Sequence, residues 1–292
     1  MKILSTQGWE EYALLDSGNG MRLERYGKFR ISRPDPQAIW SKKLVEREWS
    51  NIDAYFESDG KKGKWVEKNP VPDRWKIIYK DLAFWARLTP FKHTGVFPEQ
   101  SLQWDWMQER IRNHESGIMG KLSVLNLFGY TGIASLVCAK AGASVTHVDA
   151  SKPAVSWARE NQELSGLASA PIRFILDDAI KFLQREIKRG VRYDGIIMDP
   201  PVYGHGPGGE IWDFNKSFPE LMKLCRQVLT EKPVFIVVNA YAISASAIML
   251  ENVLSETVDG LSGQIESGEL ALQEKQGGRL LSTGIFSRWS TA

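Results

Sequence analysis

The second half of the chain alternates short apolar runs with segments in which apolar residues recur at helical spacing. Such runs are typical of buried strands, and helical segments between them are the crossovers that parallel strands require. The predicted strands are residues 121–128, 144–149, 172–176, 193–198 and 234–239, and the predicted helices are residues 133–141, 152–164, 179–188, 216–229 and 244–255. Residues 268–272 and 280–286 predict an antiparallel pair at one edge of the sheet. This half is therefore predicted to be an α/β domain with a mostly parallel sheet.

The first part of the chain has a different pattern, with short alternating runs separated by Gly/Asn turns and by prolines. Eight of the 11 tryptophans precede residue 107. We therefore predict a boundary within residues 107–120. Residues 1–107 would form a small β-rich accessory domain that binds substrate, and residues 108–292 would form the α/β domain.

Composition excludes several classes of protein. The chain has 292 residues, of which 43% are apolar and 25% charged, as in ordinary globular proteins. Its longest apolar run is far shorter than the ~20 residues of a membrane span, and its N-terminus lacks the apolar core of a signal peptide. Two cysteines, Cys138 and Cys225, form neither a disulfide framework nor a cysteine zinc site. We expect a cytoplasmic, metal-free protein, and the net charge of +2 leaves nucleic-acid binding open.

A glycine turn follows the first strand of the α/β half, at Gly129 and Gly132. Glycine allows a ligand to approach the backbone, and the helix that follows offers free N–H groups. Asp149 ends the next strand, 20 residues after Gly129, where nucleoside-binding sheets place an acid for ribose hydroxyls. The glycines alone favour a plain tight turn, but the spacing of Asp149 favours a nucleoside site.

The spacing of this turn is unlike that of a dinucleotide site, which has the pattern G-x-G-x-x-G. Here the pattern is G-x-x-G, and the bulky Phe128 and Tyr130 flank the first glycine. Their rings would crowd a pyrophosphate. S-adenosylmethionine carries no phosphate, and a helix N-terminus suits its carboxylate.

Two further acidic sites follow later strands. Asp177 and Asp178 end the third strand, where a carboxylate would accept from the adenine amino group or cap the next helix. Both roles can hold at once, with Asp177 as the cap and Asp178 at the adenine, or the reverse. Asp199, Pro200 and Pro201 end the fourth strand. Because proline cannot continue the strand, it fixes the neighbouring carbonyls as acceptors that suit an amine or amide, although a merely rigid loop is the alternative.

These motifs resemble those of a known family. Their order matches class I S-adenosylmethionine-dependent methyltransferases and, more closely, the bacterial group that methylates 23S ribosomal RNA of the large subunit. The resemblance covers about residues 90–292 and rests on Phe128-Gly129-Tyr130-Thr131-Gly132, Asp149, Asp177-Asp178-Ala179 and Asp199-Pro200-Pro201. It implies a Rossmann-like, seven-stranded, mostly parallel sheet with helices on both faces, and S-adenosylmethionine-dependent methylation of RNA, with ribosomal RNA as the expected partner.

The resemblance also implies residue roles. The turn from Phe128 to Gly132 would hold the methionine part of the donor, Asp149 the ribose, and Asp178 with Ala179 the adenine. Residues 94–100 are similar to a segment that folds back over the donor. The expected donor-binding residues are Thr94, Gly95, Phe97, Gln100, Asn126, Phe128, Gly129, Tyr130, Thr131, Gly132, Asp149, Ala150, Ser151, Asp177, Asp178, Ala179, Asp199 and Pro200.

The chain departs from the family members that methylate cytosine C5, which carry a cysteine nucleophile after the fourth or fifth strand. Neither place holds a cysteine here. We therefore expect direct in-line transfer to a nitrogen or another non-C5 atom. The expected catalytic residues are Asp199, Pro200 and Tyr203. Tyr203 would stack on a flipped base or, equally, serve only in packing.

Two segments are candidates for substrate recognition. Residues 203–210 are glycine-rich and predict a loop that would move as a lid over the substrate, with a plain surface loop as the alternative. The loop includes His205, a candidate general base. Basic residues in the first part would follow a phosphate backbone or, because acids interrupt them, form a solvated face; they are Arg22, Arg25, Lys28, Arg30, Arg33, Lys61, Lys62 and Lys64.

Other functions stay open at this point. A methyltransferase with a small-molecule or protein acceptor and a non-catalytic binder of S-adenosylmethionine are both consistent with the motifs. The missing third glycine argues against a nicotinamide-dependent oxidoreductase.

Overall fold

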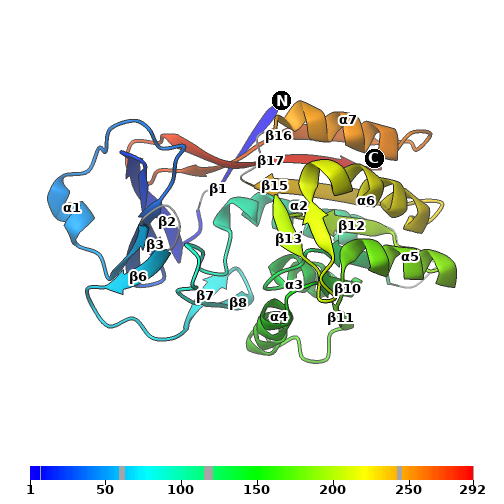
Figure 1. Ribbon diagram of the computed structural model, residues 1–292, viewed down its shortest axis with the longest axis horizontal. Coiled ribbons are helices and arrows are strands. Elements are labelled where there is room, and N and C mark those ends of the chain that lie inside the picture. Colours follow the sequence, from blue (N-terminus) through cyan, green and yellow to red (C-terminus); the bar gives the residue numbers. More distant parts are fainter. Residues whose placement is uncertain (7, 59–62, 115–120, 242–244, 292) are drawn as a thin grey trace. The chain divides into compact units, whose positions relative to one another are not determined.

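The computed structural model describes residues 1–6, 8–58, 63–114, 121–241 and 245–291. The chain forms two compact units (Figure 1). The larger unit comprises Met1–Leu4, Leu102–Leu270 and Gly284–Ala292, and the smaller unit comprises Ser5–Ser101 and Ala271–Thr283. None of the described helices is both long and apolar enough to cross a membrane.

An eight-stranded sheet is the centre of the larger unit, in the order β1-β16-β17-β15-β12-β9-β10-β11. Its strands are β1 (Lys2–Thr6), β9 (Ser123–Leu127), β10 (Ser144–Asp149), β11 (Ile172–Leu176), β12 (Gly195–Met198), β15 (Phe235–Tyr241), β16 (Gln264–Gln273) and β17 (Leu280–Ser290). Strands β15, β12, β9, β10 and β11 pair in parallel, whereas β17 is antiparallel to β15. The predicted parallel strands and the closing antiparallel pair are confirmed.

The sheet has one strand more than the seven expected, because β1 pairs with β16. The residues of β1 lack a buried apolar run, and their burial increases only toward Thr6. Strand β1 therefore forms because it pairs with β16, which is distant in sequence, and not because of a local apolar pattern.

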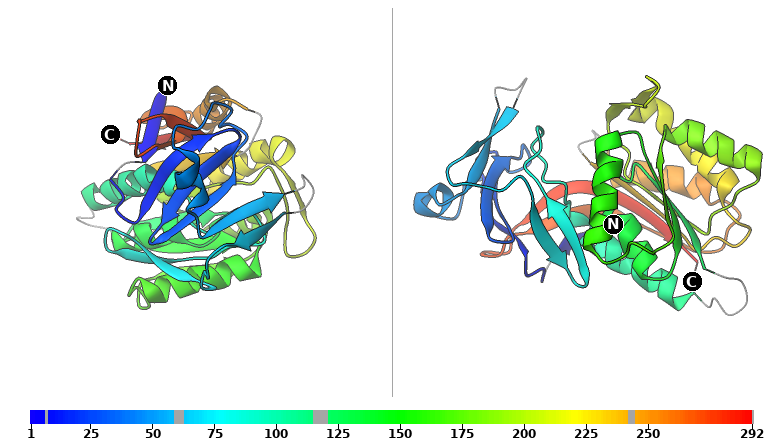
Figure 2. Two further views of the ribbon diagram at one scale, coloured as in Figure 1. Left: turned by 90° about the vertical axis from the view of Figure 1, so that its left-hand side faces the viewer. Right: turned by 90° about the horizontal axis from the view of Figure 1, so that it is seen from below.

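Helices cover both faces of the sheet, with α5, α6 and α7 on one side and α2, α3 and α4 on the other (Figure 2). They are α2 (Ser101–Asn113), α3 (Ile133–Lys140), α4 (Lys152–Leu164), α5 (Ala179–Arg189), α6 (Phe214–Val228) and α7 (Ala247–Thr257). The short 3-10 helix η1 (Pro98–Gln100) precedes α2. Helix α2 is absent from the sequence-based prediction, although Trp104, Met107 and Ile111 form a buried stripe at helical spacing.

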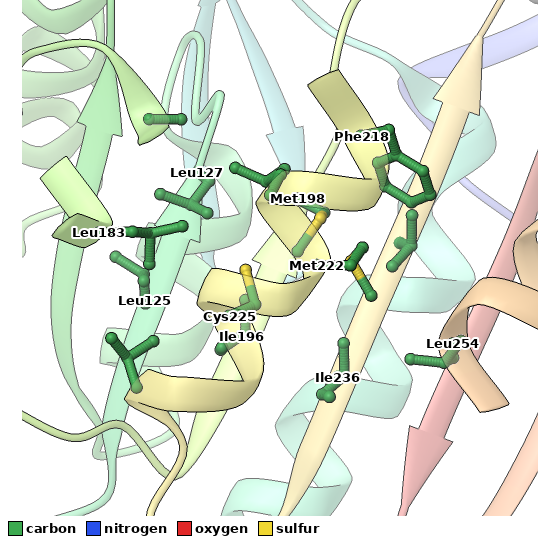
Figure 3. Packing of buried hydrophobic residues seen from close by; sticks show 14 of the residues in the cluster. Leu125, Leu127, Leu183, Ile196, Met198, Phe218, Met222, Cys225, Ile236 and Leu254 are labelled. Carbon is green, nitrogen blue, oxygen red and sulfur yellow. The ribbon is translucent and has the colours of Figure 1, made fainter. Parts of the chain in front are cut away.

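Alternate residues of the central strands form the main core (Figure 3). Leu125, Leu127, Ile196, Met198 and Ile236 all point to the face that α5, α6 and α7 cover. None of these side chains is exposed. This packing fixes the strands in register, so that their carboxyl ends lie side by side at one edge.

The smaller unit is β-rich, as predicted. A five-stranded sheet has the order β2-β3-β4-β5-β6, and β7 and β8 form a separate pair. The elements are β2 (Tyr12–Gly18), β3 (Met21–Tyr26), β4 (Phe29–Pro34), α1 (Glu46–Ser50), β5 (Ala54–Ser58), β6 (Gly63–Glu67), β7 (Trp75–Tyr79) and β8 (Leu82–Ala86). The parallel pairing of β4 with β5 follows from the crossover that contains α1.

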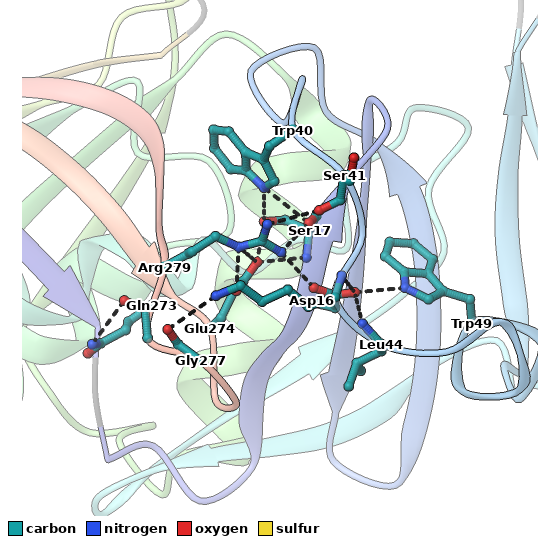
Figure 4. A network of polar contacts seen from close by, with 12 residues as sticks. Asp16, Ser17, Trp40, Ser41, Leu44, Trp49, Gln273, Glu274, Gly277 and Arg279 are labelled. Carbon is teal, nitrogen blue, oxygen red and sulfur yellow. Dashed lines mark hydrogen bonds and ion pairs between the residues drawn. The ribbon is translucent and has the colours of Figure 1, made fainter.

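A polar network ties the turn between β16 and β17 into the smaller unit (Figure 4). Arg279 pairs with Asp16 at 2.9 Å and with Glu274 at 2.8 Å, and the Ser17 hydroxyl donates to Glu274 at 2.6 Å. Asp16 and Glu274 are 1% and 2% exposed, so each buried carboxylate depends on these partners.

Candidate functional site

The candidate site is built on three adjacent strand ends. Leu127, the last residue of β9, lies opposite Val148 of β10 and Met198 of β12. The residues that follow each strand therefore emerge at the same edge. This register brings together the glycine turn, Asp149 and the Asp199-Pro200-Pro201 segment, as the sequence predicts.

The turn after β9 adopts an unusual backbone conformation. Phe128 and Tyr130 have φ angles of 54° and 48°, in the left-handed region that non-glycine residues seldom occupy, and Gly132 has φ 82°. Such conformations persist only where neighbouring contacts hold them. Here the Gly129 amide donates to the Val148 carbonyl at 3.0 Å, and the Gly132 amide donates to the Gly129 carbonyl at 2.9 Å.

Gly129 lies directly against a buried histidine. A Cβ atom at this position would overlap the imidazole ring of His147. The ring is fixed in turn, because Ser135 Oγ lies 3.0 Å from His147 Nδ1 and accepts from the Asn126 amide at 2.9 Å. Burial, with a smaller effect from Arg159, lowers the pKa of His147 to about 3, so the ring is neutral.

Asn126 therefore supports the turn from below, through Ser135 and His147. Asn126 is one of the expected donor-binding residues, and its amide lies in this buried network. Ser135 and His147 are not predicted from the sequence, because neither belongs to a recognisable motif.

The last residues of the turn are held by α4. The Asn161 amide donates to the Thr131 carbonyl at 2.9 Å, and a Cβ atom at Gly132 would lie 2.7 Å from the Ala158 Cβ. Thr131 is buried, and Gly132 is the residue before α3. The turn thus ends with helix α3 presenting its first amides at the carboxyl edge of the sheet.

Asp149 links the ends of β10 and β9. Its Oδ2 accepts from the Tyr130 amide and its Oδ1 from the Ser151 amide, each at 2.8 Å. Each carboxylate oxygen has a second lone pair for a ligand hydroxyl. Burial raises the pKa of Asp149, although the two backbone hydrogen bonds oppose this effect. Ala150 is half-buried, and Ser151 caps helix α4 through the Ala154 amide.

The two acidic residues after β11 have different partners. Asp178 caps helix α5, accepting from the Lys181 amide at 2.9 Å, and Ala179 is the first residue of that helix. Asp177 forms an ion pair with Arg185 and accepts from the Asp178 amide. Of the two alternatives for the cap, the structure shows Asp178.

The segment after β12 continues into a β-hairpin. Asp199 is half-buried and Pro200 is buried, whereas Pro201 is exposed. Strand β13 (Tyr203–His205) pairs with β14 (Ile211–Asp213), so the first three residues of the predicted loop are a strand, and residues 206–210 form the turn between the two strands. Glu210 organises the tip: its carboxylate accepts from the Gly208 amide at 2.8 Å and pairs with Lys181 of α5.

Trp212 joins this hairpin to both parts of the site. Its indole N–H donates to the Pro201 carbonyl at 2.6 Å, and its ring centroid lies 4.8 Å from that of Phe128. The side chain is 4% exposed. Trp212 is not among the residues predicted from the sequence, because only the pairing of β13 with β14 turns its side chain inward.

The two cysteines lie inside the core. Cys138 in α3 and Cys225 in α6 are both fully buried, and burial raises the pKa of each thiol. A buried, protonated thiol is a poor nucleophile. This agrees with the expectation that neither cysteine takes part in covalent catalysis.

The predicted donor-covering residues Thr94, Gly95, Phe97 and Gln100 belong to the smaller unit. Thr94 is fully buried, and its carbonyl accepts from the Arg87 amide at 3.0 Å. Their role over the donor stays a prediction.

The strand arginines of the smaller unit are structural, so the expectation of an exposed basic face is wrong for Arg22 and Arg33. Both are 2% exposed. Arg33 Nε and Arg22 Nε lie 2.5 Å and 3.4 Å from Glu24 Oε2. Burial opposes ionisation of Glu24, but these two guanidinium groups lower its pKa to about 2.

The other basic residues of this set have local partners or lie elsewhere. Arg25 donates to the carbonyls of Glu10 and Gly27, and Arg30 donates to Glu48. Lys64 lies 3.9 Å from Glu57, and Lys28 lies over the Phe29 ring. Lys61 and Lys62 lie outside the described residues.

Within the described ranges, no cluster of three or more His, Cys, Asp or Glu side chains is arranged to hold a metal ion. The site instead offers a half-buried carboxylate at Asp149, a second at Asp178 and the first amides of α3. These groups fit the hydroxyls, amine and carboxylate of a nucleoside with an amino-acid tail.

Comparison with known proteins identifies the family. A sequence family described as S-adenosylmethionine-dependent methyltransferase matches residues 51–260. The ribosomal RNA large subunit methyltransferase K of Neisseria meningitidis is 26% identical over 224 residues, and the K/L enzyme of Syntrophotalea carbinolica is 30% identical over 171 residues. The matches cover 70% and 58% of this chain but only 58% and 22% of these relatives. The chain thus spans less than two thirds of their length.

Solved structures show the same fold. A SAM-dependent methyltransferase from Agrobacterium tumefaciens is 45% identical with a TM-score of 0.95, covering 100% of this chain and 94% of that one. The structure of SMU.776 complexed with SAH has a TM-score of 0.73 at 18% identity, covering 98% of this chain and 76% of that one. With a family match over residues 51–260, the chain belongs to the S-adenosylmethionine-dependent methyltransferases, and S-adenosylmethionine is its cofactor.

Proposed function

We propose that this enzyme methylates RNA, and ribosomal RNA in particular, at a nitrogen or another atom that is not cytosine C5. The observation that carries the proposal is the strand register, which brings Asp199-Pro200-Pro201 beside the glycine turn. Both cysteines, in contrast, are buried in helices α3 and α6. The names of the relatives, ribosomal RNA large subunit methyltransferases K and K/L, support RNA as the acceptor.

The residues at the strand ends would hold the cofactor. Backbone amides of the turn from Phe128 to Gly132 would bind its methionine part, with Asp149 at the ribose hydroxyls and Asp178 with Ala179 at the adenine. Bound S-adenosylmethionine supplies an electrophilic methyl group on a sulfonium.

The segment after β12 would position the acceptor. The Asp199 carboxylate and the Pro200 carbonyl would accept hydrogen bonds from an amino group and so direct its lone pair. Orientation of this kind contributes up to ~7–11 kcal/mol in favourable cases. Tyr203, which is 56% exposed, would stack on the acceptor base.

Methylation of RNA without a cysteine nucleophile is directly testable. We expect the Cys138→Ala/Cys225→Ala variant to transfer labelled methyl groups to ribosomal RNA at a rate within about threefold of wild type. Its stability will fall by ~1 kcal/mol for each buried sulfur removed, so the assay should run well below its melting temperature. Mass spectrometry of digested RNA identifies the methylated atom. A 5-methylcytosine product, or loss of turnover in a folded variant, contradicts the proposal.

Trp212 is a positioning residue in this scheme. Trp212→Phe keeps an aromatic ring against Phe128 but removes the N–H that holds the Pro201 carbonyl. A neutral hydrogen bond contributes ~0.5–1.5 kcal/mol. We therefore expect kcat to fall roughly 2- to 12-fold, with the affinity for S-adenosylmethionine unchanged. A variant that weakens cofactor binding but keeps kcat would assign Trp212 to the cofactor instead.

A further inference from the structure

The β13–β14 hairpin has two different faces. Tyr203 lies opposite Asp213, Gly204 opposite Trp212, and His205 opposite Ile211. Opposed residues share a face of an antiparallel pair, and successive residues alternate. Tyr203, His205, Ile211 and Asp213 therefore lie on one face, and Trp212 lies on the other.

The inner face is buried, but the outer face exposes Tyr203, His205 and Ile211 beside the half-buried Asp213. Trp212 is 4% exposed, whereas Tyr203 and Ile211 are 56% and 67% exposed. The Tyr203 and His205 rings meet at right angles with centroids 5.3 Å apart. Tyr203 and Ile211 of this face are two of the eleven large apolar side chains that are exposed in the part of the chain the structure describes, and Val202, just before the hairpin, is a third. A concentration of this kind marks an interaction surface.

Contacts at both ends hold this face in place. At the base, the Trp212 indole donates to the Pro201 carbonyl and the Phe214 amide donates to the Val202 carbonyl at 3.0 Å. At the tip, Glu210 pairs with Lys181 of α5. The hairpin is thus held rigid at both ends, so little conformational entropy is lost when a ligand binds to its outer face.

The charges around the face are neutralised locally. Lys181 pairs with Glu210, and Lys216 lies 3.8 Å from Asp213. A phosphate backbone is held by cations that are not already neutralised, whereas a nucleobase stacks on rings and apolar side chains. The chemistry of this face therefore suits a base and not a phosphate.

We propose that the outer face of the hairpin binds the nucleobase next to the nucleotide that is methylated, in a single-stranded segment of RNA. This rests on the proposed RNA methyltransferase function. The hairpin leaves the acceptor segment at Pro201, and Tyr203 comes first along it. With the acceptor base at Tyr203, the neighbouring base reaches His205 and Ile211.

The test compares a double substitution on the hairpin face with the substitution of an exposed isoleucine elsewhere. Fluorescence anisotropy with labelled octa-adenylate, in the presence of S-adenosylhomocysteine, measures binding to wild type, to His205→Ala/Ile211→Ala, and to Ile248→Ala as the control. Ile248 lies in α7 and is 56% exposed, close to the 67% of Ile211. We expect the double variant to bind about 5- to 150-fold more weakly, the effect of one stacked base, with the control at wild-type affinity.

A second probe identifies what is bound. This probe is a set of octamers, each with a single abasic nucleotide at a different position. We expect wild type to bind such an octamer more weakly than octa-adenylate. The double variant should bind both with the same affinity. Affinity for S-adenosylhomocysteine should stay unchanged in all three proteins.

Two results would contradict the proposed base-binding site but leave the proposed function standing. The first is equal affinity of wild type and double variant for octa-adenylate. The second is a dimer in wild type that the double variant loses without losing RNA affinity. The second would make the face a protein contact. If wild type neither binds nor methylates RNA, the proposed function fails with it.

Discussion

Asp199→Asn is expected to lower kcat for methyl transfer by about a hundredfold or more while the affinity for S-adenosylmethionine stays within about twofold of wild type. The carboxylate follows β12 directly, beside the glycine turn after β9. Its hydrogen bond to an acceptor amine is worth ~1.5–3 kcal/mol, and the orientation of the lone pair is lost with it. Asparagine keeps the size of the side chain but offers one acceptor oxygen without charge.

Asp194 provides the control for this variant, because it lies at the opposite end of the same strand. Its Oδ2 accepts from the Ser123 amide at 2.8 Å. Asp194→Asn should lower thermal stability but leave kcat close to wild type. Equal loss of kcat in both variants would mean that Asp199 acts through the stability of β12 and not on the acceptor.

Gly129→Ala is expected to weaken S-adenosylmethionine binding by about 5- to 150-fold, corresponding to the ~1–3 kcal/mol cost of overpacking. The added methyl would overlap the His147 ring, which Ser135 holds from the other side. The turn must then move away from β10, and the Tyr130 amide moves with it from Asp149. Isothermal titration measures the effect.

Two further variants separate this clash from a general effect of adding a methyl group. In Gly204→Ala the new Cβ would meet only Pro201 Cγ, at 3.6 Å, so cofactor affinity should not change. In Gly129→Ala/His147→Ala the ring is absent, so part of the affinity should return. If the cofactor affinity of this double variant is as low as that of Gly129→Ala, the steric explanation is contradicted.

Local patterns predicted the α/β sheet and the chemistry at its edge. The strands before Gly129, Asp149 and Asp199 are short apolar runs, and each ends where a glycine, an acid or a proline stops it. Parallel pairing then requires these residues to meet at one edge, so the position of the site follows from the order of the motifs.

Contacts between distant residues account for what the sequence did not predict. Strand β1 exists because it pairs with β16, and the burial of Arg33 depends on Glu24 of the neighbouring strand. Residues 203–210 contain the glycines of a loop, yet β13 and β14 pair because Trp212 is buried against Phe128. None of these partners is marked by local spacing.

The central claim is that the cofactor lies across the carboxyl ends of β9, β10 and β11. A crystal structure with S-adenosylhomocysteine tests this most directly. We predict ribose hydroxyls within hydrogen-bond distance of the Asp149 carboxylate, the homocysteine part against the backbone from Phe128 to Gly132, and adenine beside Asp178. A ligand bound at any other edge of the sheet, or one whose ribose does not touch Asp149, would contradict the account.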